Sequence, residues 1–456
     1  MTTEVDHSGY IVSKDNEHFA YDFKEGVLTL HLYDAIPEID GSNTLLTRSF
    51  DNKRYLFFSQ LPLQIGEMHL FPITFNYHVD WLIQGYETGS KFDKVIFSFD
   101  ELQYFCPSAS VVQQEDNKII FLRELKEIKK FTFELMGTKC EACFCLGTNG
   151  KTGFANSYMQ AETILTITFE ATDNMEFIQK IYQLVDSVFS FICNRRNTGC
   201  VSMELRGIYP AKTIEEKKIV DCIKRCKSYM YFFDKYREDV ESKKVISKTF
   251  NASPFLVHID NLFELVAKDI DDIDDKCASI SISSVHPSVK RRMLIDLQQS
   301  LQITGAFEFY VRRYLPDMTE EKSHHAIMKM LLKEFAENNS VNNKARKLAL
   351  SLERNVIREP ALEDKIVKDY EGYDDWRPLK NCLKQGWFDE EEIRALAKEA
   401  NEWRNELAHS KRSYEPNERT IHAVRLMEHM NYSIVLRELG YTDDEIADLL
   451  EFVLVR

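Results

Sequence analysis

The chain has 456 residues, of which 44% are hydrophobic and 12% aromatic. Disordered chains are poor in both classes, so this composition excludes a largely disordered protein. The net charge of −15 at pH 7 excludes a protein that coats nucleic acid through a broad basic field, although it leaves room for a local site.

The first part of the chain is predicted to form strands, because apolar and polar residues alternate and β-branched and aromatic residues are frequent there. The clearest runs cover residues 27–33, 55–58, 95–99, 118–122, 131–135 and 163–169. Short strands separated by turn residues, without βαβ units, are typical of a β-sandwich or an open barrel. We therefore expect a β-rich N-terminal domain over residues 1–200.

Helical periodicity follows. Apolar residues recur at helical spacing over 174–188, 214–236 and 257–273, and the second stretch carries Ile219, Ile223, Cys226 and Met230 on one predicted face. The first of these helices is expected to pack on the β-rich domain. We interpret residues 201–284 as a helical connector.

The remainder is predicted to be an all-α domain over residues 285–456, so the fold class is α+β with several domains. Helices are expected over 289–314, 319–338, 341–358, 362–384, 389–411, 416–439 and 442–454. This part carries 27 basic and 31 acidic residues, against 31 and 42 in the rest of the chain. The balance favours the C-terminal domain for an anionic substrate.

No stretch reaches the ~18 consecutive apolar residues of a membrane span, and the chain starts with polar residues. We therefore expect a cytoplasmic protein with no membrane segment. The 10 cysteines are expected to stay reduced in that compartment.

The most informative stretch lies in the helix predicted over 389–411. Its apolar residues are spaced by four, three and four positions: Leu396, Ala400, Trp403 and Leu407. They form one stripe that should face the core of the helical domain. At about 100° per residue, Arg404 lies at the edge of this stripe, and Asn405 and His409 share the next face.

Arg404 and His409 together suit phosphodiester cleavage. A histidine can take or give a proton near neutral pH, and an arginine offers a charged planar fork to phosphate oxygens. RNA supplies its own nucleophile, the 2′-hydroxyl, so neither a metal nor a cofactor is required. Asn405 could orient the histidine or the phosphate. The same residues also fit a structural interpretation, in which Arg404 pairs with a nearby carboxylate and His409 caps a helix C-terminus.

The sequence Glu402-Trp-Arg-Asn-Glu-Leu-Ala-His-Ser410 resembles the motif of the HEPN superfamily, in which an arginine is followed by a polar residue, three further residues and a histidine. The layout of the chain also resembles that of ApeA-like proteins, which have a β-rich N-terminal domain and a C-terminal HEPN domain. The segments Gly26-Val-Leu-Thr-Leu30, Ile39-Asp-Gly41 and Tyr55-Leu-Phe-Phe58 are loosely similar to that N-terminal family.

The resemblance implies a metal-independent endoribonuclease of bacterial anti-phage defence that acts by abortive infection, with tRNA as a plausible RNA substrate. It implies Arg404 and His409 as catalytic residues and Asn405 as a supporting residue. The site of this family is composite, which implies a homo-oligomer, a dimer or larger. The N-terminal domain would sense a phage-encoded trigger, expected to be a protein.

Two alternatives stay open. Cys140 and Cys143, together with Cys222 and Cys226, could supply four thiolates to zinc, or they could be buried thiols. The C-terminal domain could also be a non-catalytic oligomeric platform or an RNA-binding regulator, with a structural arginine and histidine. RNA cleavage in EDTA that leaves a cyclic phosphate would distinguish the enzyme from the regulator.

Overall fold

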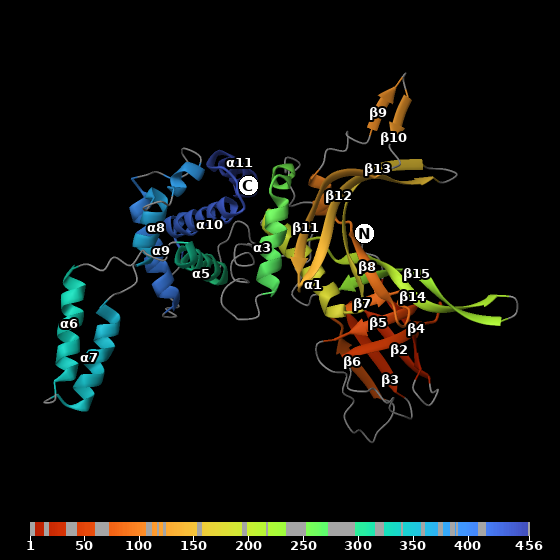
Figure 1. Ribbon diagram of the computed structural model, residues 1–456, viewed down its shortest axis with the longest axis horizontal. Helices are drawn as coiled ribbons and strands as arrows, with labels where there is room; N and C mark the ends of the chain where they lie inside the picture. The colour runs from red at the N-terminus through yellow and green to blue at the C-terminus, as the bar shows by residue number, and fades with distance from the viewer. Residues whose placement is uncertain are drawn as a thin grey trace. The chain divides into compact units, whose positions relative to one another are not determined.

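Thirteen strands of the N-terminal part form one antiparallel sheet in the computed structural model (Figure 1). These strands are β1 His7–Val12, β2 His18–Lys24, β3 Val27–Leu32, β4 Thr44–Ser49, β5 Arg54–Phe58, β6 Ile73–His78, β7 Trp81–Gln84, β8 Lys91–Phe97, β11 Lys126–Leu135, β12 Thr138–Thr152, β13 Ser157–Thr172, β14 Ser202–Glu215 and β15 Lys218–Phe232. Their order in the sheet is β11-β12-β13-β8-β14-β15-β7-β5-β4-β1-β2-β3-β6. Strands β9 Val112–Glu115 and β10 Lys118–Phe121 form a separate hairpin.

The structure describes residues 5–12, 18–32, 43–59, 73–105, 112–115, 118–121, 125–152, 157–193, 198–215, 218–233, 252–271, 297–314, 323–338, 341–356, 361–372, 377–383, 388, 391–408 and 416–454. The chain divides into two units, an N-terminal unit of residues 1–193 and 197–271 and a C-terminal unit of residues 194–196 and 272–456. The predicted class is confirmed, because a large antiparallel sheet comes first and helices follow.

Two-residue turns fix the register of two hairpins in the sheet. Glu25 and Gly26, between β2 and β3, have φ values of 51° and 79°, and Met136 and Gly137, between β11 and β12, have 51° and 69°. Positive φ at both central positions is the mark of a type I′ turn, whose twist matches that of the strands. Most non-glycine residues resist this conformation, so a glycine at the second position lowers the cost of each turn.

Aromatic residues fill the space between the sheet and two helices, α1 (Met175–Cys193) and α3 (Ile259–Asp271). The ring of Phe263 on α3 lies 5.0 Å from that of Phe131 on β11, and Phe189 on α1 lies 4.8 Å from Phe99. All four side chains are buried. A second cluster of buried residues, around Tyr21, Phe57 and Leu82, is formed by side chains of β1–β5 and β7.

The helix predicted over 214–236 is wrong. Residues 214–215 belong to strand β14 and residues 218–232 to strand β15, and the two strands pair in register from Ser202–Tyr231 to Glu215–Lys218. Strand β14 also pairs with β8, and β15 with β7, so this hairpin is part of the main sheet. The N-terminal unit extends to Asp271, which leaves residues 202–271 outside any separate helical connector. The expected boundary at 284 lies outside the described residues.

Helices make up the C-terminal unit. They are α5 Leu297–Tyr314, α6 Ser323–Glu337, α7 Asn343–Val356, α8 Leu362–Glu371, α9 Ile393–Ala408, α10 Glu418–Glu438 and α11 Asp443–Leu454. Helices α5, α8, α9, α10 and α11 pack together, with α10 at the centre, and α6 and α7 pack against each other as a hairpin. From Leu426 to Leu436, every residue of α10 is buried.

The helix predicted over 362–384 is shorter than expected. Helix α8 stops at Glu371, because Gly372 takes a left-handed φ of 96° and Pro378 follows six residues later. A short 3₁₀ turn, Leu379–Cys382, covers the end of the predicted stretch. Over the described residues, none of the helices is both long enough and apolar enough to cross a membrane.

Candidate active site on helix α9

Helix α9 carries the candidate residues and is anchored by its apolar stripe. Leu396, Ala400 and Trp403 are 4%, 1% and 0% exposed, as the spacing predicts, while Leu407 is half-buried. Because residues three and four apart share a helix face, this stripe fixes the rotation of α9 about its axis. The next position after Trp403 is therefore held at the border between the core and the solvent, where Arg404 lies.

Arg404 is held by two side chains. Its Nη2 donates to both carboxylate oxygens of Glu308 on α5, at 3.2 and 3.4 Å, and its Nη1 donates to Oδ1 of Asn405 at 3.3 Å. The Arg404 side chain keeps 40% of its surface exposed, and that of Glu308 keeps 20%. The guanidinium thus has a fixed position with N–H groups still open to solvent, since it carries five donors.

The ion pair with Glu308 is the contact that the structural interpretation of Arg404 expects. The ion pair is therefore an observation that fits a non-catalytic arginine. A half-exposed pair of this kind contributes only about 0–1 kcal/mol to stability.

The structure brings Arg404 and Asn405 together. His409 follows the last residue of α9 and lies outside the described residues. Its candidate role therefore rests on the motif in the sequence.

Glu308 was missed by the sequence reasoning. It lies 96 residues before Arg404, and no local spacing links the two. The available signal was the apolar stripe of α5, whose buried members include Ile303, Phe307 and Val311 and which places Glu308 beside the packed face. A buried hydrogen bond from Asn431 Nδ2 on α10 to the Ile303 carbonyl, at 3.0 Å, ties α5 to the centre of the unit.

The start of α10 is also bound to α9. Asn417 and Thr420 form a capping box, in which each side chain accepts from the other residue's backbone N–H, at 2.9 and 3.3 Å. The Thr420 hydroxyl donates to Glu399 of α9 at 2.6 Å. These contacts hold the start of α10 against α9.

One buried histidine of α10 is not a candidate acid or base. His429 Nδ1 lies 2.7 Å from the carbonyl oxygen of Arg425, one turn earlier, and its ring packs edge-on to Phe388. Burial lowers the pKa of His429 to about 4, so the ring is neutral at physiological pH. It acts as part of the core.

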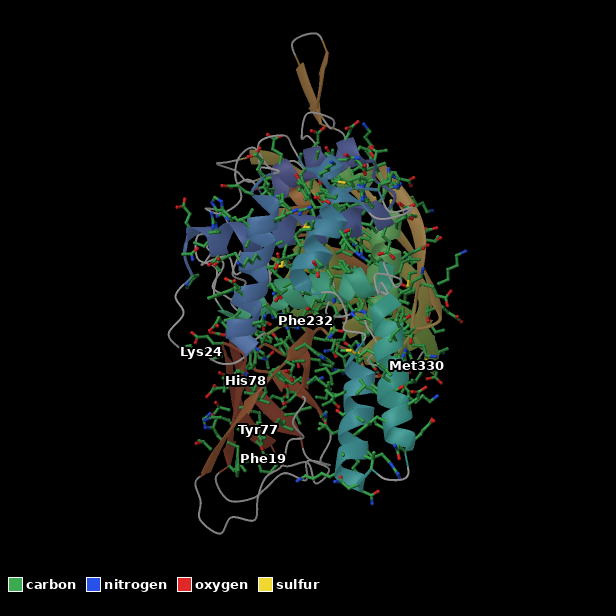
Figure 2. All side chains as sticks on the ribbon, turned by 90° about the vertical axis from the view of Figure 1, so that its left-hand side faces the viewer. Phe19, Lys24, Tyr77, His78, Phe232 and Met330 are labelled. Atoms are coloured by element: carbon green, nitrogen blue, oxygen red, sulfur yellow. The ribbon has the colours of Figure 1, made fainter. Side chains whose placement is uncertain are left out.

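The hairpin of α6 and α7 exposes apolar side chains, among them Met330, which is 54% exposed and is labelled in Figure 2. Ile327, Leu331 and Phe335 form a stripe at spacing four on α6 and are 57%, 55% and 50% exposed. The residues of α6 that are covered instead include Ala336, which is 5% exposed. An amphipathic helix usually buries such a stripe, so this face has the character of a contact surface.

The four cysteines considered for zinc do not form a common site. On strand β12, Cys140 and Cys143 are three residues apart and point to opposite faces of the sheet. Cys222 and Cys226 lie on β15, and three strands stand between β12 and β15. At about 4.8 Å per strand this is about 19 Å along the sheet, whereas each thiolate must lie about 2.3 Å from a zinc ion.

Burial also raises the pKa of the Cys140 and Cys143 thiols to about 12, so both are protonated. Within the described ranges, no group of three or more His, Cys, Asp or Glu side chains is arranged to hold a metal ion.

Comparison with known proteins gives one match. Residues 301–445 match the family model described as Apea-like HEPN. This range begins within α5 and ends within α11, so it includes Glu308, Arg404, Asn405 and His409. No curated protein and no solved structure matches the chain.

Proposed function

Because residues 301–445 match the Apea-like HEPN family model, we propose that the protein is a metal-independent endoribonuclease of bacterial anti-phage defence. Arg404 and His409 are its catalytic residues, and Asn405 supports Arg404. The observation that carries this proposal is the guanidinium of Arg404, which is oriented by two neighbours yet exposed, on a helix whose sequence matches the HEPN motif.

The reaction uses the substrate's own nucleophile. The 2′-hydroxyl attacks the adjacent phosphorus, the bond from phosphorus to the 5′-oxygen breaks, and a 2′,3′-cyclic phosphate and a free 5′-hydroxyl form. One histidine takes the proton of the 2′-hydroxyl, and another returns a proton to the leaving oxygen. Arg404 donates to the non-bridging oxygens, on which negative charge builds in the transition state.

A second Arg404 and a second His409 reach the site only if two copies meet, so the active form in this proposal is a homo-oligomer, a dimer or larger. The exposed apolar stripe of Ile327, Leu331 and Phe335 supports such an assembly, because its burial against a second copy would remove several large side chains from water. Symmetric contacts between identical copies are the common way in which soluble proteins assemble.

The N-terminal unit is the sensor in this proposal. A phage-encoded protein would bind to it and release the nuclease in the cytoplasm, where cleavage of tRNA or another essential RNA would stop growth of the infected cell. The division of the chain into a β-rich unit and a helical unit supports this separation of sensing from cleavage.

A second function is favoured by one contact. The ion pair between Arg404 and Glu308 would suit a non-catalytic oligomeric or RNA-binding regulator in which the arginine is structural. In that case the chain would bind RNA or a partner without cutting RNA.

Controlled expression in a bacterial host distinguishes the two. Sequencing of RNA fragments after induction should reveal new ends in the wild type, and none with Arg404→Ala or His409→Ala at equal protein level. Cleavage by the purified protein should continue in EDTA, because no metal takes part. Wild-type cleavage by either variant would contradict the assignment, and the absence of cleavage by the wild type, triggered or not, would favour the regulator.

A further inference from the structure

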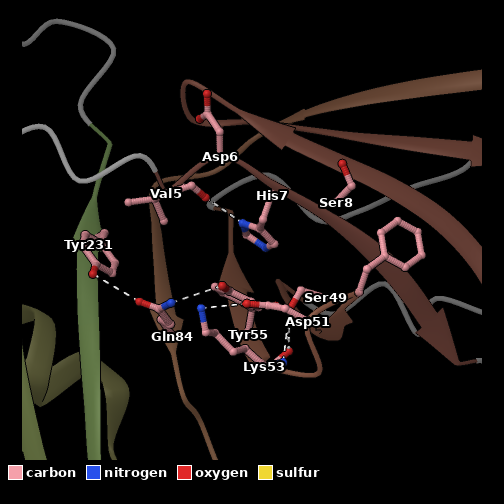
Figure 3. A pocket seen from close by; sticks show the side chains of 11 residues that line it. Val5, Asp6, His7, Ser8, Ser49, Asp51, Lys53, Tyr55, Gln84 and Tyr231 are labelled. Carbon is pink, nitrogen blue, oxygen red and sulfur yellow. Dashed lines mark hydrogen bonds and ion pairs between the residues drawn. The ribbon is translucent and has the colours of Figure 1, made fainter.

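Two adjoining cavities open beside β4, β5, β7 and β15 in the N-terminal unit. Their volumes are about 490 and 530 Å³, and Lys53 and Gln84 line both. Cavities of about 300–1,000 Å³ are typical of sites for small ligands. Figure 3 shows the smaller of the two from close by.

The larger cavity is cationic. Its charged lining residues are Arg48, Lys53, Arg54, Lys227 and Glu87. Four cations and one carboxylate thus line it, in a stretch of chain, residues 1–284, where 42 acidic residues outnumber 31 basic ones. Lys53 also forms an ion pair with Asp51 of the smaller cavity, at 2.7 Å. The charge balance of the sequence favoured the C-terminal domain for an anionic ligand, but this concentration of positive charge makes the N-terminal cavity a second candidate.

Two of these cations are placed against each other. Arg48 on β4 and Arg54 on β5 are directly opposite cross-strand partners. Like charges in that arrangement destabilise a sheet. Glu87 forms an ion pair with Arg54, whereas Arg48 has no carboxylate partner among the described residues. An anion bound in the cavity would offset this repulsion.

An aromatic ring accompanies the cations. The ammonium group of Lys227 lies 5.2 Å from the centre of the Tyr229 ring, and Tyr229 is 37% exposed. Lys227 also pairs with Glu204, at 2.9 Å. Cations interleaved with exposed aromatic rings are the usual lining of sites for nucleotides, because the phosphate meets the charge and the base stacks on the ring.

The smaller cavity has an aromatic lining held by a chain of hydrogen bonds (Figure 3). The Tyr231 hydroxyl donates to Gln84 Oε1 at 3.2 Å, and Gln84 Nε2 donates to the Tyr55 hydroxyl at 3.2 Å. The ring of His7 stacks on Tyr55, with centroids 3.8 Å apart. These contacts hold the polar edge of the cavity in place before any ligand arrives.

His7 lines this cavity, and its buried Nε2 is an acceptor without a hydrogen-bond partner among the described residues. Its Nδ1 lies 2.6 Å from the Val5 carbonyl oxygen, which can only accept, so Nδ1 carries the proton. Burial lowers the pKa of His7, which leaves Nε2 as an acceptor. That buried Nε2 has no hydrogen-bond partner among the described residues. It requires a donor, which a phosphate or a carboxylate lacks and the amino group of a nucleobase supplies.

We propose that the two cavities together bind a nucleotide unit, with its phosphate among Arg48, Lys53 and Lys227 and the amino group of its base donating to Nε2 of His7. The unit is either a free nucleotide or one residue of an RNA strand. This site goes beyond the proposed cleavage, since it lies in the N-terminal unit and uses none of the residues of α9.

The test uses the full chain with Arg404→Ala, so that RNA is bound but not cut. Binding of AMP and of an octamer of adenylate with a 5′-phosphate is measured by titration. Adding Arg48→Gln and Lys227→Gln should weaken binding of both probes at least about tenfold and flatten the salt dependence. Adding Lys126→Gln and Lys268→Gln, which removes equal charge from exposed sites of the same unit, should change little.

Two further measurements test whether the base is bound as proposed. Purine riboside monophosphate, which lacks only the amino group of AMP, should bind about tenfold more weakly because Nε2 of His7 stays unpaired. Tyr229→Ala, at a position that is 37% exposed, should weaken AMP binding severalfold. Similar affinities for AMP and the octamer would identify a free nucleotide, and a much tighter octamer would identify RNA.

Several outcomes would overturn the proposal. They are equal binding by the cavity variant and the control variant, displacement of AMP by inorganic phosphate or polyglutamate at equal concentration, and no binding of either probe by the parent chain. These outcomes do not test the proposed RNA cleavage, because the binding titrations use the Arg404→Ala chain.

Discussion

Substitution of Arg404 and of Glu308, one at a time, separates the effect of their ion pair on stability from the effect of the guanidinium on catalysis. The distances of 3.2 and 3.4 Å describe a two-oxygen ion pair, but the exposures of 40% and 20% leave it largely screened by solvent. Its contribution to the free energy of unfolding should therefore be about 0–1 kcal/mol. Arg404→Ala and Glu308→Ala delete the same pair, so both should lower stability by that amount in urea unfolding.

Their effects on RNA cleavage should differ. Removal of a group that stabilises transition-state charge costs about 3–4 kcal/mol, so Arg404→Ala should slow single-turnover cleavage by about 100- to 1,000-fold. Glu308→Ala leaves the guanidinium in place but less well oriented, and we expect a loss of about tenfold. Equal losses of activity in the two variants, in step with their stability, would refute a catalytic role for Arg404.

Three further predictions concern the packing of the C-terminal unit. Trp403→Ala removes a side chain that is 0% exposed and should lower the free energy of unfolding by about 3–5 kcal/mol in urea; a loss below about 1 kcal/mol would mean that α9 is not packed as described. Leu331→Glu should lower the mass of the assembly in light scattering, whereas Leu125→Glu, at an equally exposed leucine of the N-terminal unit, should not; an unchanged mass would exclude the α6 surface. The pKa of His429 is about 4 in the native state and about 6.5 in the unfolded chain, so the unfolded chain binds the proton first as the pH falls. This histidine should therefore lower the free energy of unfolding by about 1.4 kcal/mol for each pH unit between pH 6.5 and pH 4 as the pH falls. His429→Gln should remove this slope and His422→Gln, at an exposed position of the same helix, should keep it.

Local periodicity was enough to predict most elements. The strands predicted over 27–33, 55–58 and 131–135 overlap β3, β5 and β11, and each described helix of the C-terminal unit lies within a stretch predicted to be helical. These patterns work because one face of each element is buried and the other is not.

The same contrast between a buried and an exposed face explains why residues 214–236 were predicted to form a helix. Ile219 and Ile223 are 72% and 73% exposed, in a stretch of β15 that pairs only with β14, while Cys226 and Met230 are buried on the opposite face. Exposed isoleucines on one face and buried residues on the other imitate a helical spacing. No local signal could reveal that the hairpin extends β8 and β7 of one sheet, because that pairing joins residues more than 100 positions apart.

The residues of the candidate site were likewise predictable only in part. Arg404 and Asn405 follow from the stripe of α9 and the motif, both of which are local. Glu308 does not, since its contact depends on how α5 packs against α9. The cationic cavity was missed for a related reason: Arg48 and Lys227 are distant in sequence, and only the strand order of the sheet brings them to one wall.

The most direct measurement is cleavage of an RNA whose sugar at the scissile position lacks the 2′-hydroxyl. The fragments made in the host identify that position, and the purified protein is then given the matched ribose and deoxyribose substrates in EDTA. We expect rapid cleavage of the ribose substrate, with a cyclic phosphate on the product, and no cleavage of the deoxyribose substrate. Cleavage of the deoxyribose substrate at a comparable rate, or a requirement for a divalent metal, would contradict the proposed reaction.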